Sequence, residues 1–152
     1  MSHTPHMVDI SQKPPVHREA TAAGRIRLRR ETIERIKRGE VEKGDPLQIA
    51  TVAAIMAVKN TPQIVPLCHP IPIHAVKVDY EIGETWIEAR VTVKTKAETG
   101  VEMEALTGVT AALLAIWDVV KKYEKDEGGQ YPYTKIDNIK VIRKEKHGPT
   151  TN

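Results

Sequence analysis

The sequence is short of several residue types, and each shortage narrows the classes of protein to which it can belong. Cys68 is the single cysteine in 152 residues, which excludes an intrachain disulfide and favours a reducing compartment. Phenylalanine is absent, and the six other aromatic residues form no strand-borne set for stacking bases, which argues against a nucleic-acid-binding module. No uncharged apolar run approaches the roughly 18 residues that a membrane-spanning helix needs. The first residues lack the charged and apolar parts of a signal peptide. We therefore expect a cytoplasmic protein with no membrane and no nucleic-acid partner.

The length and charge of the chain set the next limits. A chain of 152 residues can bury a sizeable core, and we expect one domain. We expect mobile ends at about residues 1–10 and 146–152. The formal charge is +3 and the pI is about 9.0, which points weakly to an anionic partner such as nucleotide phosphate, nucleic acid or an acidic surface.

The segment 16–30 has the periodicity of a strand. Arg25, Arg27 and Arg29 alternate with Ile26 and Leu28. Two readings of these arginines stay open, because a solvated strand face and a row of phosphate contacts would look the same in sequence.

Two helices are predicted next. Residues 31–38 read as a short helix that stops at Gly39. A second helix follows Asp45, which is a good N-cap, with Pro46 at the first helical position and Gln48 to complete a capping box. It ends before Pro62. Lys43 stands just outside the positive end of this helix, where a cation together with free N–H groups would bind an anion.

The segment 61–72 contains four prolines and reads as a stiff loop that excludes a helix. Pro70 pushes His69 towards extended geometry, so the loop would hold this histidine in one place. A metal site of Cys68, His69 and His74 is an alternative, but the spacing matches no zinc pattern, and we expect neither a metal nor a cofactor.

Alternating apolar residues at 76–82 and 87–93, separated by a turn at Gly83 and Glu84, predict an antiparallel hairpin with one buried face. Residues 138–144 read as a last strand. The order is strand, two helices, two strands, long helix, strand. We therefore predict an α+β fold, ferredoxin-like, with an antiparallel sheet and the helices packed on one face.

The longest predicted helix spans residues 99–123, with Thr99 and Glu102 as a capping box. Spacing predicts one buried face, made of Met103, Leu106, Thr110, Leu113, Trp117 and Val120. A second face has small residues between Glu104 and Asp118, and Gly108 implies close packing. Asp118 and Lys121 are either an ordinary surface pair or a catalytic one.

Six short motifs together make the chain resemble the MoaC family of cyclic pyranopterin monophosphate synthases. They are MVDIS at residues 7–11, the segment 18–26, KGD at 43–45, PLCHP at 66–70, TGVEMEALT at 99–107 and WDVVK at 117–121. The resemblance implies a ferredoxin-like homohexamer, a trimer of dimers with active sites between subunits. It also implies a cyclised GTP substrate supplied by a radical enzyme, and the products cyclic pyranopterin monophosphate and pyrophosphate.

The resemblance also assigns residues. It implies that Asp118 and Lys121 are the catalytic pair. It places further residues at the substrate: Arg18, Lys43, Cys68, His69, Glu102, Met103, Glu104 and Lys144. The family usually ends the last strand in a lysine-rich glycine segment, whereas residues 144–148 here read KEKHG, so Lys146 is an alternative to Lys144.

These assignments agree with the chemistry of the residues. A triphosphate needs several cations, and a ring rearrangement needs clustered acid–base groups. We expect neighbouring cations to lower the pKa of Lys121, with Asp118 orienting it. A purely structural oligomer is the remaining alternative, suggested by the small residues of the long helix.

Overall fold

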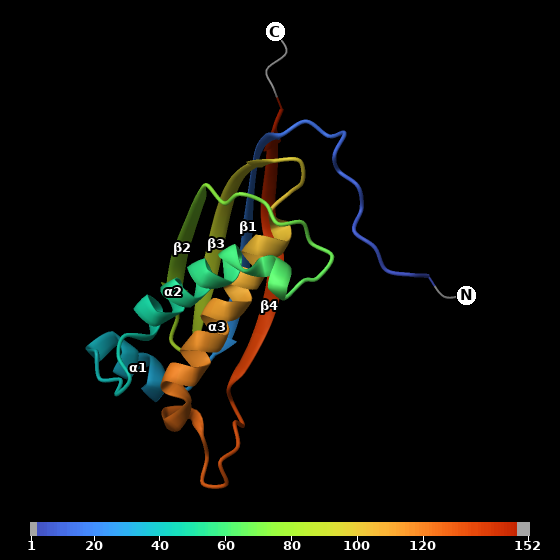
Figure 1. Cartoon of the computed structure of the whole chain (residues 1–152). Coiled ribbons are helices and arrows are strands. Elements are labelled where there is room, and N and C mark those ends of the chain that lie inside the picture. The colour runs from blue at the N-terminus through green and yellow to red at the C-terminus, as the bar shows by residue number, and fades with distance from the viewer. Residues whose placement is uncertain (1–2, 149–152) are drawn as a thin grey trace.

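A four-stranded antiparallel sheet forms the base of the fold (Figure 1). The computed structural model describes residues 3–148; residues 1, 2 and 149–152, which belong to the predicted mobile ends, lie outside the described residues. The strands are β1 (Val16–Arg27), β2 (Ala75–Ile82), β3 (Trp86–Ala97) and β4 (Lys135–His147), in the order β2-β3-β1-β4. β1 pairs antiparallel with β3 on one side and β4 on the other.

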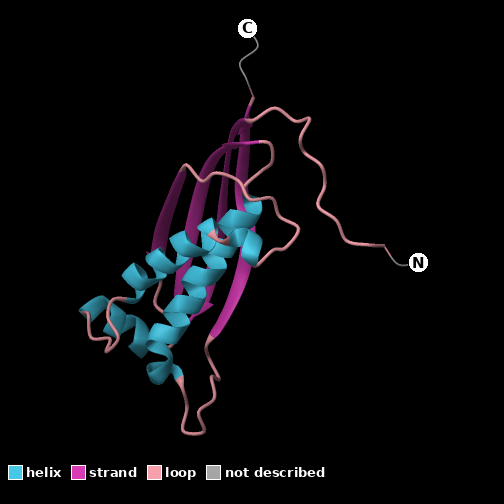
Figure 2. Cartoon of the chain, in the orientation of Figure 1, coloured by secondary structure: helices cyan, strands magenta, loops and turns pink. Residues whose placement is uncertain are grey.

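The helices α1 (Arg30–Arg38), α2 (Pro46–Lys59) and α3 (Glu102–Glu124) lie on one side of this sheet, as Figure 2 shows. α2 and α3 pack side by side, and α1 lies at the end of the sheet near the last turns of α3 (Figure 1). The predicted α+β fold is confirmed. With α1 and α2 counted together, the elements follow the strand–helix–strand–strand–helix–strand order of ferredoxin-like domains.

The stop signal at Gly39 and the N-cap at Asp45 are confirmed, whereas within residues 3–148 no hydrogen bond from Gln48 completes the predicted capping box. Gly39 ends α1 in the left-handed region at φ 69°, and its N–H bonds to carbonyls in the last turn. The carboxylate of Asp45 accepts the backbone N–H of Leu47 at 2.9 Å and so caps α2. The loop 61–72 is less extended than predicted, because Thr61–Gln63 forms one turn of 3₁₀ helix. β4 is longer than the predicted 138–144 by three residues at each end.

The predicted capping box of α3 is wrong. The helix begins at Glu102, and Val101 occupies the N-cap without a side-chain cap. Glu102 instead forms an ion pair with Lys144 of β4, whose Nζ lies 2.7 Å from Oε1. The carboxylate that the sequence pattern assigned to the helix cap is therefore paired with a cation of β4.

The predicted buried face of α3 is only partly correct: Leu113 and Val120 are fully buried, but two other members of that face are not. Met103 is 41% exposed and Thr110 is exposed, whereas Ala105, Val109 and Ile116 are fully buried. The small residues face inward because α2 comes close: a Cβ on Gly108 would lie 2.8 Å from Val58 Cγ2. Ala112 also belongs to the core.

The helix α3 meets the length and hydropathy criteria for a membrane-spanning helix, although the sequence contains no long uncharged apolar run. An 18-residue window of this helix has mean hydropathy 1.5, so by length and composition alone it would span a membrane. Half of that window is buried within the fold. The core helix of a soluble domain meets the same criterion, because its apolar residues face a sheet instead of lipid.

Candidate active site

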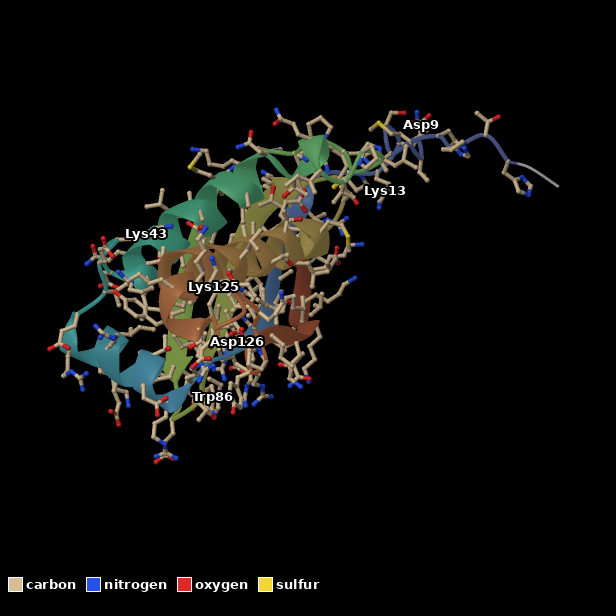
Figure 3. All side chains as sticks on the ribbon, turned by 90° about the horizontal axis from the view of Figure 1, so that it is seen from below. Asp9, Lys13, Lys43, Trp86, Lys125 and Asp126 are labelled. Atoms are coloured by element: carbon tan, nitrogen blue, oxygen red, sulfur yellow. The ribbon has the colours of Figure 1, made fainter. Side chains whose placement is uncertain are left out.

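A lysine–aspartate cluster of Lys43, Asp118 and Lys121 lies near the C-terminal end of α3. Lys121 Nζ lies 3.0 Å from Asp118 Oδ1. Lys43, in the turn before α2 (Figure 3), donates to Asp118 Oδ2 at 3.3 Å and to its carbonyl oxygen at 3.4 Å. All three side chains are about half exposed, so the cluster carries two accessible cations around one carboxylate.

The pKa of Lys121 shifts in the direction opposite to the prediction. Hydrogen bonds from Lys121 and then Lys43 lower the pKa of Asp118. The hydrogen bond to Asp118 raises the pKa of Lys121. The expectation of a lowered pKa is therefore wrong for this chain, because the hydrogen bond and the charge of Asp118 stabilise the protonated ammonium. Lys121 carries its proton at neutral pH.

A carboxylate cluster of Arg18, Cys68, Glu102, Glu104 and Lys144 lies at the other end of α3. Although burial alone would raise it, the hydrogen bond and charge of Lys144 hold the pKa of Glu102 below its ordinary value, with a smaller contribution from Arg18. Arg18 also donates to the carbonyl oxygens of Ala97 at 3.3 Å and Glu98 at 3.4 Å. The register places Lys144 beside Ala20, and Lys144, not Lys146, forms the ion pair with Glu102.

Glu104 is the most deeply buried polar group of the carboxylate cluster. It is 1% exposed, and its Oε1 has no hydrogen-bond partner among residues 3–148. The Cys68 thiol donates to its Oε2 at 3.5 Å. Burial raises the pKa of Glu104, and burial together with the charge of Glu104 raises that of Cys68 to about 11. Cys68 is thus a neutral thiol, and Glu104 offers one oxygen to an N–H or O–H donor.

His69 lies next to Cys68, but its ring contacts a segment to which the sequence assigned no role. His69 Nε2 lies 2.7 Å from the carbonyl oxygen of Val8, so the ring N–H donates to the N-terminal segment. Val8 belongs to the motif at residues 7–11, but its side chain is neither an acid, a base nor a metal ligand. The sequence therefore offers no reason to assign it a role in the site.

The alternative of a metal at the loop 61–74 receives no support from the geometry. His74 Nδ1 accepts the backbone N–H of Lys96 at 3.2 Å, and Nε2 of His69 is hydrogen-bonded to the carbonyl oxygen of Val8. Within residues 3–148 no three His, Cys, Asp or Glu side chains are grouped so as to hold a metal ion. The absence of a structural metal stays a prediction.

The two clusters are far apart in one chain. Glu102 and Asp118 are sixteen residues apart on α3, which at 1.5 Å per residue is about 24 Å. The outer face of the helix between them is apolar, and a hollow of about 320 Å³ opens on it. Its lining includes Ile64, Met103, Leu106, Thr107, Ala111 and Leu114.

Comparisons with known proteins decide the family. The model of the MoaC family matches residues 7–147. The chain belongs to the MoaC family. Curated relatives carry the name "Probable cyclic pyranopterin monophosphate synthase". One, from Pyrococcus abyssi, is 57% identical over 140 residues, covering 92% of this chain and 88% of the relative. Another, from Methanoregula boonei, is 59% identical over 140 residues, covering 92% and 90%. A third, from Methanococcoides burtonii, is 58% identical over 141 residues, covering 93% and 89%.

In this member of the MoaC family, the ten predicted site residues thus fall into two groups. Lys43, Asp118 and Lys121 gather at one end of α3. Six others gather at its start or in the loop that faces it: Arg18, Cys68, His69, Glu102, Glu104 and Lys144. Met103, also in the first turn of α3, points instead to the apolar face between the groups.

Proposed function

We propose that this chain is a cyclic pyranopterin monophosphate synthase, a lyase of molybdenum cofactor biosynthesis. It converts 3',8-cyclo-7,8-dihydro-GTP into cyclic pyranopterin monophosphate and releases pyrophosphate. One structural observation carries the proposal beyond family membership. Lys43 meets Asp118 although the two are 75 residues apart in sequence, and with Lys121 it places two half-exposed cations around one carboxylate, the arrangement that a phosphate chain needs.

The lysine–aspartate cluster suits the step that releases pyrophosphate. In that step a ribose hydroxyl loses its proton as its oxygen attacks the α-phosphorus and forms a new P–O bond, and the bond from the α-phosphorus to the bridging oxygen of the pyrophosphate breaks. Two cations beside the leaving group stabilise the charge that develops on it. Asp118 holds the ammonium of Lys121 at 3.0 Å, so the charge is in position before the substrate arrives.

The carboxylate cluster suits the ring of the substrate. A guanine-derived ring presents N–H donors, and Glu104 Oε1 is a buried acceptor without a partner in the part of the chain that the structure describes. A substrate N–H would satisfy this oxygen, and a ring lacking that donor would leave it unpaired, which is the usual source of strong discrimination. Arg18 and Lys144 add positive charge beside Glu102, and Cys68 and His69 line the same end of α3.

One substrate molecule cannot bring both clusters into play within one chain. Acid–base groups act within hydrogen-bond reach of the atoms they serve, and the clusters are about 24 Å apart along α3. We therefore propose that each active site combines the carboxylate cluster of one protomer with the lysine–aspartate cluster of a second copy. A two-fold axis crossing α3 near its middle would bring opposite ends of the two helices together and create two equal sites.

The apolar outer face of α3 is the surface that this pairing would use. Leu114 is 61% exposed and Met103 is 41% exposed, and the polar clusters stand at either end of this face. Small residues such as Ala111 would let two helices approach closely. A trimer of such dimers gives the hexamer that the family resemblance implies. We place the enzyme in the cytoplasm with a small-molecule substrate and with neither membrane nor nucleic acid as a partner.

The test is incubation with the cyclised GTP substrate, followed by measurement of pyrophosphate and of the pterin product. Wild-type protein should form both in equal amounts. Lys121→Ala should form neither at a comparable rate. Lys122→Ala is the matched control, because within residues 3–148 the next lysine on the helix pairs with Glu42 and forms no ion pair with Asp118. No turnover by assembled wild-type protein would favour a binding or structural role.

A further inference from the structure

The loop between α3 and β4, residues 125–134, is ordered by its own hydrogen bonds. The carboxylate of Asp126 accepts the backbone N–H groups of Gly128 and Gln130, both at 2.9 Å. The Asp126 N–H donates to the carbonyl of Gln130 at 2.9 Å. At the end of the loop the buried hydroxyl of Thr134 donates to Glu124 at 2.7 Å. Lys125 and Asp126, where the loop leaves α3, are labelled in Figure 3. These bonds fix the side chains that the loop carries.

One of those side chains, Tyr131, packs beside the lysine–aspartate cluster. Its ring meets Trp117 edge to face, with ring centroids 5.2 Å apart and an interplanar angle of 74°. Trp117 precedes Asp118 by one residue and Lys121 by four, so Trp117 and Lys121 share one face of α3. Helical side chains lean towards the helix N-terminus, which brings the Lys121 ammonium back over the turn that Tyr131 covers. The 3.0 Å ion pair with Asp118 agrees with that direction.

The hydroxyl of Tyr131 is available to a ligand. Among residues 3–148 it forms no hydrogen bond, and the side chain is only partly buried. The neighbouring cluster has two ammonium groups for one carboxylate, so the ligand that it attracts is an anion. A phenol O–H next to two cations is a third donor for phosphate oxygens.

We propose that Tyr131 is a substrate-binding residue whose hydroxyl donates a hydrogen bond to the phosphate chain held by Lys43 and Lys121. This inference rests on the proposed function, since the phosphate chain is that of the cyclised GTP. It also gives the loop a role: the Asp126 turn and the contact with Trp117 hold the hydroxyl in place before the substrate binds. The simpler alternative is that Tyr131 only covers Trp117.

Tyr131→Phe separates the two roles, because phenylalanine keeps the ring on Trp117 and removes only the hydroxyl. A hydrogen bond to a charged group is worth about tenfold or more in affinity. We therefore expect Tyr131→Phe to raise KM about tenfold while changing kcat less than twofold. Tyr133→Phe is the control from the same loop, since its ring is 62% exposed and packs against Arg29 instead; it should match wild type. Equal KM values for wild type and Tyr131→Phe would overturn the proposal.

A second measurement does not depend on turnover. In a Trp86→Phe background Trp117 is the remaining tryptophan, and its emission reports on ligands at the cluster. Titration with inorganic tripolyphosphate should give a Kd about tenfold weaker after Tyr131→Phe. If wild type fails to turn over the cyclised substrate, the proposed function fails, and this titration still decides the role of Tyr131. Equal affinities, or no tripolyphosphate binding to wild type, would refute it.

Discussion

The carboxylate of Glu124 links α3 to the start of α1 and to the end of the loop before β4, and its replacement should be strongly destabilising. The residue is fully buried. Its carboxylate accepts the backbone N–H of Arg29 at 3.1 Å, the hydroxyl of Thr134 at 2.7 Å and the hydroxyl of Thr32. Arg29 is the N-cap of α1 and has no side-chain cap of its own. The start of α1 is therefore capped by a carboxylate from α3.

The cost of losing this carboxylate follows from the groups left behind. Glu124→Ala leaves three donors without their acceptor, and each buried donor left unpaired costs about 1–3 kcal/mol. Arg29 and a relaxed Thr134 can reach water, which brings the expected total to about 3–5 kcal/mol. Glu124→Gln keeps the shape and one acceptor oxygen, and the Thr134 hydroxyl can rotate to accept from the amide. We expect it to cost only about 1–2 kcal/mol.

Urea denaturation at one fixed protein concentration is the assay, because association would otherwise shift the midpoint. Glu127→Ala is the control. Glu127 lies three residues after Glu124, in the loop between α3 and β4, is exposed and forms no ion pair with the described part of the chain, so its change should stay within about 0.5 kcal/mol. A cost below about 1 kcal/mol for Glu124→Ala, or equal costs for Ala and Gln, would refute the capping role.

Three further outcomes are expected. Asp118→Asn and Lys121→Ala should each lower turnover by about 10²–10⁴-fold without loss of helix content by circular dichroism. Near-normal rates would return them to a surface pair. Lys43→Ala should weaken tripolyphosphate binding, more strongly at low salt, because screening shrinks the lost attraction; a salt-independent Kd equal to wild type would contradict this. Burial raises the pKa of Glu104 above its ordinary 4.5, so its contribution to stability is full below pH 4.5 and is lost as pH rises through the raised value. Unfolding free energies of Glu104→Gln should therefore decline less than those of wild type between pH 4.5 and neutrality, and parallel curves would argue against it.

Much of the fold could be predicted because its signals are local. Gly39 and Asp45 act through backbone groups within a few residues of themselves, and the β2–β3 hairpin follows from alternation along a short segment. The start of α3 was missed for the opposite reason. The partner of Glu102 is Lys144, more than forty residues away, and a tertiary ion pair overrode a local capping pattern.

The site residues stay a prediction of the sequence, and the contacts among them come from the structure. Spacing on α3 gave Asp118 and Lys121 as neighbours, whereas the arrival of Lys43 depends on how α2 packs against α3. The same packing decides which face of α3 is buried. Since Gly108 has no side chain, Val58 of α2 can pack directly against the backbone of α3. The unpaired oxygen of Glu104 and the contact between His69 and Val8 also depend on tertiary structure.

The central claim is that each active site combines opposite ends of α3 from two protomers, and complementation tests it most directly. Arg18→Ala damages the carboxylate cluster, and Lys121→Ala damages the lysine–aspartate cluster; each protein alone should be inactive. After subunit exchange of equal amounts, half of the dimers contain one chain of each kind, and one of their two sites has both wild-type residues. Activity should therefore return to about a quarter of the wild-type value. No recovery, with exchange demonstrated by mass-tagged subunits, would place both clusters in one chain's site and contradict the account.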